Sequence, residues 1–285
     1  MSEEERADER ESIVRFPMPD DSHVLTFDLE RANLRGRVIR LGKVLDHILG
    51  AHHFPEVIEK LLVETITISV LLSSMLKYEG IFILQAHGTG AVTRLVADVT
   101  SSGDIRGTAG FDTEKLQQLG AEHPTPSASD LLGAGYLAFT VDQGEFMERY
   151  QGIVELKNTL LESFHHYFDQ SEQLRSRLFI ASEKTDEGIW KSSSLLLQEL
   201  PEHKVDEDAW VYMESLLKTL SPQEFLNFSI PYETLLTRLF HEGDVAAFDP
   251  IALKAQCRCS QERIKTFLST LTHDEIESLL EEGEL

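Results

Sequence analysis

Alternating hydrophobic and polar positions predict two strands near the start of the chain. Leu25, Phe27 and Leu29 alternate with polar residues, the pattern of a half-buried strand. Residues 34–41 (LRGRVIRL) predict a second strand. Its glycine, Gly36, marks either a bulge or a close approach of neighbouring backbone. We therefore expect the ordered part of the chain to begin with β-structure.

Residues 55–77 predict one long helix. Apolar residues recur there at helical spacing and also fill the other faces. Pro55 suits a first helical position. Because a helix that is apolar nearly all round is normally buried, we expect this one at the centre of the first domain.

Four further strands are predicted between residues 81 and 141. Turn residues separate them at Gly88–Thr–Gly90 and at Ser101–Ser–Gly103–Asp104. Consecutive strands with short turns imply an antiparallel meander rather than βαβ units. The predicted strands are residues 81–86, 92–99, 104–111 and 136–141.

The second half of the chain is mainly helical in pattern. Helical spacing returns at residues 159–179, a helical bundle is predicted at 206–241, and 243–255 is predicted to be a linker. A helix is then expected at about 260–271. Two capping boxes mark helix starts, at Ser221–Glu224 and at Thr272–Glu275.

These patterns predict an α+β fold. A mixed or antiparallel sheet packs on the long buried helix, and a helical middle region and a small C-terminal module of zinc type follow. The expected division is a flexible acidic arm at 1–20, an N-terminal α/β domain at 21–180, a helical middle and linker region at 181–250, and a partial C-terminal redox or zinc module at 251–285.

The charge balance narrows the choice of partners. The chain carries 49 acidic residues against 26 lysines and arginines, a formal net charge of −23. This disfavours nucleic acid and an anionic membrane surface as partners. The most apolar stretch, Leu61 to Leu76, contains Glu64 and is shorter than the roughly 20 residues of a bilayer span. The first residues do not form a signal peptide, so we expect a cytoplasmic protein.

The two cysteines, Cys257 and Cys259, are the most informative chemical feature. Thiolates two positions apart can bind one zinc ion, although structural zinc requires four ligands. Their oxidation to a disulfide would close a small, strained ring, and strained disulfides are labile and regulatory. Arg258 lies between them and favours the thiolate form. A pair of ordinary small residues in a linker is the alternative interpretation.

Other candidate motifs are weaker. Neighbouring histidines on a helix point in different directions, which disfavours His52–His53 and His165–His166 as ligand pairs. His273 with Asp274 could complete a metal site, but a first-turn position in a helix explains His273 better. The sequence contains no P-loop, G-x-S-x-G or H-E-x-x-H motif, and we predict no catalytic residue and no enzyme activity.

The ordered series of motifs resembles the Hsp33 family of redox-regulated bacterial holdase chaperones. The resemblance runs from about His23 to the end of the chain. It rests on LRGRVIRLG (34–42), MLKYEGIFILQAHGTG (75–90), IRGTAGF (105–111), YQGIVEL (150–156), YFDQSEQL (167–174), LLTRLFHEGDVAAFDP (235–250) and CRCSQERI (257–264).

This resemblance implies an N-terminal α/β domain, a middle region that senses folding state, and a C-terminal zinc module. In the family, C-x-C joins a later C-x-x-C to hold zinc in the reduced, inactive state. Oxidation forms two disulfides, expels zinc, unfolds the module and the linker, and exposes a surface for unfolding client proteins without ATP. Cys257 and Cys259 match the first pair, as metal ligands and as redox-active residues.

The sequence departs from the family pattern at its end, because it stops at Leu285, about where the second cysteine pair would follow. Either this sequence is a truncated piece of the gene product, or this lineage lacks half of the ligands. Two thiolates cannot close the zinc site within one chain, so we expect residues 251–285 to be weakly held and the active form to be favoured. Three alternatives stay open: a constitutively active holdase, a thiol–disulfide oxidoreductase, and a homodimer whose protomers pool four thiolates around one zinc ion.

Overall fold

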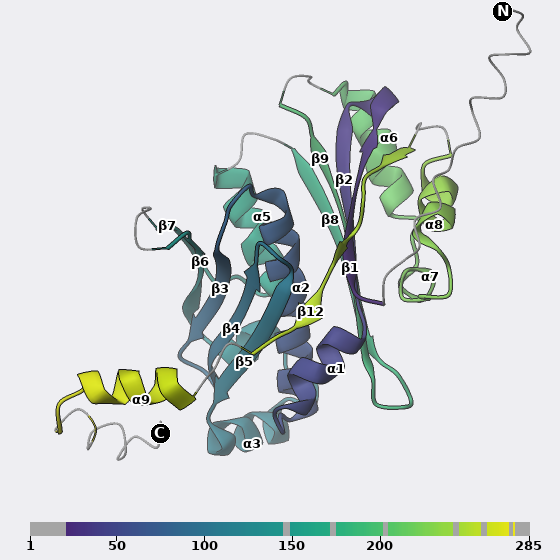
Figure 1. Cartoon of the computed structure of the whole chain (residues 1–285). Helices are drawn as coiled ribbons and strands as arrows, with labels where there is room; N and C mark the ends of the chain where they lie inside the picture. Colours follow the sequence, from purple (N-terminus) through teal and green to yellow (C-terminus); the bar gives the residue numbers. More distant parts are fainter. Residues whose placement is uncertain are drawn as a thin grey trace, which may run out of the picture. The chain divides into compact units, whose positions relative to one another are not determined.

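The computed structural model describes residues 21–144, 149–171, 175–201, 205–241, 245–257, 261–273 and 276 (Figure 1). The predicted acidic arm, residues 1–20, lies outside this range. The chain forms two units, Met1–Ala255 and Gln256–Leu285. The predicted boundaries at residues 180 and 250 stay predictions.

The first sheet of the larger unit is antiparallel, with the strand order β10-β1-β2-β9-β8 and with β11 also paired to β1. Both predicted N-terminal strands are confirmed. Gly36 is not a bulge, because it pairs with Phe27 in a continuous register. The group that approaches it closely is the Phe27 ring, which occupies the space of a Cβ, and not neighbouring backbone as predicted. The strands are β1 (His23–Leu29), β2 (Leu34–Leu41), β8 (Ser176–Lys184), β9 (Trp190–Glu199), β10 (Val245–Ala247) and β11 (Ile251–Ala252).

The second sheet has the order β12-β5-β4-β3-β6-β7. The predicted meander is confirmed for β3 to β5, and β6 pairs with the other side of β3. Among the strands that the structure describes, only β12 is parallel to its neighbour. The strands are β3 (Ile81–Gly88), β4 (Val92–Thr100), β5 (Asp104–Phe111), β6 (Gly135–Asp142), β7 (Tyr150–Glu155) and β12 (Lys254–Ala255).

Helix α2 (Glu56–Met75) lies between the two sheets (Figure 1). On one face, the hydroxyl of Thr67 lies 2.7 Å from that of Ser192 in β9. On the opposite face, Ser69 donates to the carbonyl of Ala97 in β4. Thirteen of its 20 residues are buried, which confirms the central buried helix that its all-round apolar pattern predicts. Pro55 is the N-cap rather than the first helical residue.

A second core covers the other face of the first sheet. Side chains of β1, β2 and β9 pack there against the predicted helical bundle, which is confirmed as α6 (Glu207–Leu217), α7 (Pro222–Phe225) and α8 (Tyr232–Leu239). Ser221 caps α7 by accepting from the Glu224 amide. The other helices of this unit are α1 (Lys43–Gly50), α3 (Thr113–Glu122), α4 (Ala128–Leu132), α5 (Leu160–Ser171) and the 3-10 turn η2 (Glu30–Ala32).

Two local predictions are wrong. The helix predicted at 159–179 ends with α5 at Ser171, and β8 begins at Ser176 because this segment pairs along its length with β9. The linker predicted at 243–255 contains three short strands, β10 to β12, which are stabilised by pairing with strands far away in the sequence. In both segments tertiary pairing overrides the local pattern.

In the smaller unit, the predicted helix at about 260–271 is confirmed as α9 (Gln261–Thr270). The last predicted capping box includes Asp274 and Glu275, which lie outside the described residues.

Candidate functional site

Residues 245–255, here called the strap, join the outer edges of the two sheets. Strands β10 and β11 pair with β1, and β12 pairs with β5. Between strands, the Phe248 amide donates to the Thr26 carbonyl at 2.9 Å and the Leu253 amide to the Ser22 carbonyl at 3.0 Å. Leu253 is buried in the core between the sheets. The strap is therefore part of the folded unit.

The strap covers hydrogen-bonding groups that would otherwise be exposed. The unpaired edge of a strand is a template for other extended chains, and proteins normally protect such edges. Here β10 and β11 occupy the side of β1 that faces away from β2, and β12 occupies the side of β5 that faces away from β4. Release of the strap would expose both edges and uncover the hydrophobic surface under Leu253.

The predicted redox residues follow the strap directly in the sequence. Ala255 ends β12, and Cys257 comes two positions later, in the smaller unit. The side chain of Cys257 is exposed. Cys259 lies outside the described residues, so the structure does not show the two sulfur atoms together. Exposure makes the Cys257 thiol accessible to a soluble oxidant.

The described residues do not supply a complete zinc site. Thiolate is a suitable zinc ligand, but the sequence has two cysteines and a structural site takes four ligands. Within the described ranges, no cluster of three or more His, Cys, Asp and Glu residues could hold a metal ion. Of the histidine pairs, His52 stacks on Phe54 and His165 packs edge-on against Phe164. Zinc binding by Cys257 and Cys259 stays a prediction.

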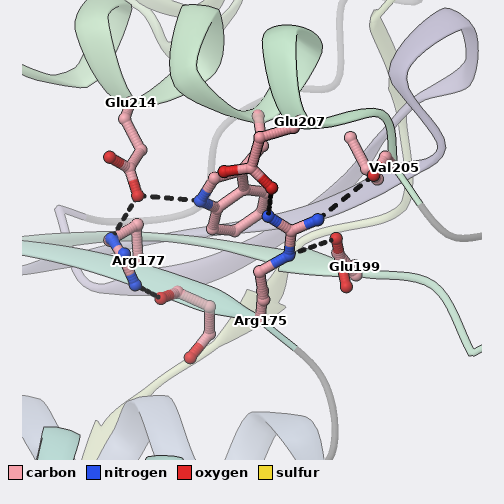
Figure 2. A network of polar contacts seen from close by, with 8 residues as sticks. Arg175, Arg177, Glu199, Val205, Glu207 and Glu214 are labelled. Atoms are coloured by element: carbon pink, nitrogen blue, oxygen red, sulfur yellow. Dashed lines mark hydrogen bonds and ion pairs between the residues drawn. The ribbon is translucent and has the colours of Figure 1, made fainter.

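A polar network that local sequence patterns did not reveal attaches α6 to the first sheet (Figure 2). Arg175 donates to Glu199 at 2.9 Å, to Glu207 at 2.6 Å and to the Val205 carbonyl at 3.2 Å. Arg177 pairs with Glu214 at 2.5 Å.

The buried Trp210 completes this network. Its indole N–H donates to Glu214 at 2.7 Å, and both arginines lie over its ring, at 5.3 and 5.6 Å from the centroid. The contacts join β8, β9 and α6. The network therefore fixes the helical middle region to the sheet whose other edge is covered by the strap.

A second cluster attaches α8 to the same sheet. Arg40 of β2 is buried, donates to the Ile230 carbonyl at 2.7 Å and lies 4.3 Å from the ring centroid of Tyr232. Burial lowers the pKa of Arg40 and raises the pKa of Tyr232. Two nitrogens of Arg40 and the Tyr232 hydroxyl have no hydrogen-bond partner among the described residues. No local signal predicts this cluster, because its members are about 190 residues apart in the sequence.

Comparison with known proteins agrees with this architecture. A sequence model of the Hsp33 protein matches residues 22–285. The chain belongs to the Hsp33 family. The matched range includes the strap and Cys257, the elements from which the candidate site is built.

Several Hsp33 relatives are named "33 kDa chaperonin". The Caulobacter vibrioides relative is 36% identical over 92% of this chain and 89% of its own length. The relative from Nitrosococcus oceani is 35% identical over 92% and 85%, and that from Escherichia coli is 32% identical over 94% and 89%. Membership of the Hsp33 family supports a chaperone function, with unfolded proteins as binding partners.

A solved Hsp33 structure confirms the fold. The 33 kDa chaperonin from Thermotoga maritima superposes with a TM-score of 0.73, covers 92% of this chain and 89% of its own, and is 20% identical in sequence. The α+β fold predicted from the sequence is therefore correct. In the described part of the chain, no helix combines the length and apolarity needed to cross a membrane.

Proposed function

We propose that this chain is a redox-regulated holdase, which binds unfolding proteins under oxidative stress and prevents their aggregation without ATP. Thiol oxidation at Cys257 and Cys259 is the switch. The observation that carries this proposal is the strap: it covers the edges of β1 and β5 and ends two positions before Cys257. We place the chain in the cytoplasm and assign it no enzyme activity.

The proposed switch is a two-electron oxidation. The thiols of Cys257 and Cys259 give two protons and two electrons to one hydrogen peroxide molecule, which becomes two water molecules, while the sulfur atoms form one disulfide bond. Since a ring of this size needs a bend in the chain, its closure disfavours extended backbone next to it. The nearest extended backbone is β12 at Lys254–Ala255, and loss of its pairing begins the release of the strap.

Release of the strap supplies the two properties that a holdase needs. A client-binding surface must be apolar and covered until it is required, and a two-state element must respond to the chemical signal. Leu253 is buried when the strap is in place. The exposed edges of β1 and β5 then offer main-chain hydrogen bonds to extended client segments, independently of client sequence.

The test is suppression of aggregation of a thermally unfolding client by the full chain, after reduction and after treatment with peroxide. Light scattering gives the readout. We expect strong suppression after oxidation and weaker suppression after reduction. The matched variant is Cys257→Ser/Cys259→Ser, in which peroxide should no longer change the activity.

Other results of these assays would distinguish the proposal from its alternatives. Equal suppression in both states identifies a constitutively active holdase, and absence of suppression in both states contradicts the proposal. Turnover in an insulin-reduction assay that depends on both cysteines would indicate a thiol–disulfide oxidoreductase instead. Metal analysis that finds one zinc ion per dimer would support the shared zinc site.

A further inference from the structure

A cavity of about 540 Å³ opens where the two sheets meet the C-terminal end of α2. Its volume is in the range of sites that bind organic ligands. Aliphatic and aromatic side chains form most of its wall, including Leu76 of the segment after α2, Phe82 of β3 and Tyr167 of α5. The strap does not contribute to its lining, so the cavity is separate from the edges that the strap covers.

Arg37 of β2 lines this apolar cavity with a positive charge. Its side chain is 8% exposed. The guanidinium Nε donates to the Ser74 carbonyl at 3.2 Å, whereas Nη1 has no hydrogen-bond partner among the described residues. Burial lowers the pKa of Arg37 to about 10, so the side chain is still charged at neutral pH. A buried donor without an acceptor is costly. Because Nη1 is itself inaccessible to solvent, the Arg37 side chain has to shift towards the cavity before an acceptor there can reach it.

The carboxylates near Arg37 are already paired with other arginines. Asp28 accepts two hydrogen bonds from Arg35, at 2.7 and 2.9 Å. Glu199, which also lines the cavity, accepts from Arg175 at 2.9 Å. Lys77 adds another cation to the lining. The whole chain is acidic, but charges more than about 8 Å away are screened at physiological salt. The local preference for an anion is therefore determined by Arg37 and Lys77 and by the pairing of the nearby carboxylates.

The mouth of the cavity continues into exposed apolar surface. Leu76 and Tyr150 line the cavity and are 43% and 58% exposed. Ile153, in the same strand as Tyr150, is 63% exposed. This strand, β7, is an edge strand of the second sheet, and in the described part of the chain it pairs only with β6. An extended peptide can therefore reach from the cavity onto β7, whereas a small molecule would use the cavity alone.

We propose that this cavity binds an unfolded client segment in which a carboxylate side chain neighbours aromatic or aliphatic residues. The carboxylate accepts a hydrogen bond from Arg37, the apolar neighbours fill the cavity, and the flanking residues lie against Tyr150 and Ile153. This inference rests on the proposed function, because it names the clients that the holdase prefers. It predicts selection by side-chain charge, which pairing with strand edges does not provide.

The test uses two labelled, capped pentapeptides, Leu-Phe-Asp-Phe-Leu and Leu-Phe-Asn-Phe-Leu, with binding to the full chain measured by fluorescence anisotropy. We expect the wild type to bind the Asp peptide about tenfold more tightly, which corresponds to about 1.4 kcal/mol. Arg37→Gln should remove this preference. Arg238→Gln, which removes an exposed arginine outside the cavity, should preserve it. Tyr150→Ala should weaken both peptides alike.

Equal affinity of the wild type for the two peptides would overturn the proposal, and this comparison requires no variant to fold. If Arg37→Gln still binds the Asp peptide more tightly than the Asn peptide, and its circular dichroism spectrum matches that of the wild type, the proposal is likewise overturned. Sodium decanoate serves as a probe for a small-molecule site. Decanoate binding that depends on Arg37, without binding of the Asp peptide, would assign the cavity to free carboxylates and reject the client proposal.

The two proposals fail in different ways. If the wild type suppresses aggregation but does not discriminate between the peptides, the holdase proposal stands and the cavity proposal is rejected. If the Asp peptide binds through Arg37 but no aggregation is suppressed in either redox state, the carboxylate site stands and its assignment to holdase clients is rejected.

Discussion

Gly103 and Ala252 approach each other so closely that a Cβ at Gly103 would lie 2.5 Å from the carbonyl oxygen of Ala252. Gly103 ends the turn before β5, and Ala252 ends β11 in the strap. Gly103 also has a φ of +87°, which favours glycine. Its carbonyl accepts from the Lys254 amide at 2.9 Å. The absence of a side chain at residue 103 therefore lets the strap cross between the sheets.

Gly103→Ala should loosen the strap. The new methyl group collides with the Ala252 carbonyl and strains the backbone, which we expect to cost about 1–3 kcal/mol of stability. Proteolysis within residues 245–257 should become faster, and aggregation suppression by the reduced protein should increase. Limited proteolysis with mass spectrometry and the light-scattering assay measure these effects.

The control for this change is Gly188→Ala. Gly188 has a similar φ of +82°, but a Cβ there meets nothing within 4 Å. This variant shares the backbone strain without the collision, so its strap should be cleaved at the wild-type rate. Equal cleavage of the two variants would show that the contact with Ala252 does not hold the strap.

The buried Tyr232 and the half-buried Tyr78 should respond in opposite directions to loss of the hydroxyl. The Tyr232 hydroxyl has no hydrogen-bond partner among the described residues, so Tyr232→Phe removes an uncompensated polar group. We expect a gain of about 1 kcal/mol. Tyr78 donates to the Val99 carbonyl at 3.0 Å, and Tyr78→Phe should cost about 1 kcal/mol. Urea unfolding measures both changes, and destabilisation by Tyr232→Phe would contradict the first.

Glu64 of α2 should make stability depend on pH. Burial raises its pKa above the ordinary 4.5, against smaller opposing effects of Lys60 and the Leu161 backbone. The folded state then binds the proton more tightly than the unfolded state, so the contribution of Glu64 to stability falls as pH rises above about 4.5. At neutral pH the charge of the partly buried Glu64 is a cost.

Glu64→Gln should therefore be more stable than the wild type at pH 7.5, and this difference should shrink as the pH falls towards 4.5. Urea unfolding measures the stability of both proteins. The protein concentration should be low, because the isoelectric point is near 4.8 and a protein with little net charge tends to aggregate. A variant that is less stable at pH 7.5, or a difference that does not vary with pH, would contradict this account.

Trp210 should contribute to stability through its indole N–H and its ring. Trp210→Phe keeps an aromatic ring but removes the donor to Glu214 and weakens the stacking of Arg175 and Arg177. We expect a loss of about 1–2 kcal/mol. The exposed pair Arg238–Glu224 provides the comparison, because Arg238→Gln should change stability by less than about 0.5 kcal/mol. Equal effects of the two variants would show that the network adds nothing beyond a surface ion pair.

The sequence by itself determined the elements whose signal is local. Strand β2 matches its predicted bounds of 34–41. Helix α2 could be placed at the centre, because a helix with apolar residues on every face must be covered on every face. The C-x-C pair could also be recognised from the sequence, because its chemistry depends on two residues that are only two positions apart.

Only the tertiary structure decided which distant segments meet. Ala247 pairs with Phe27 and Ala255 with Ile105, so a segment predicted to be a linker is a strap across two sheets. Arg37 and Tyr150 line one cavity although β2 and β7 belong to different sheets. Hydrogen bonds between edge strands and contacts across a core depend on partners a hundred or more residues away, and no periodicity within a short window records them.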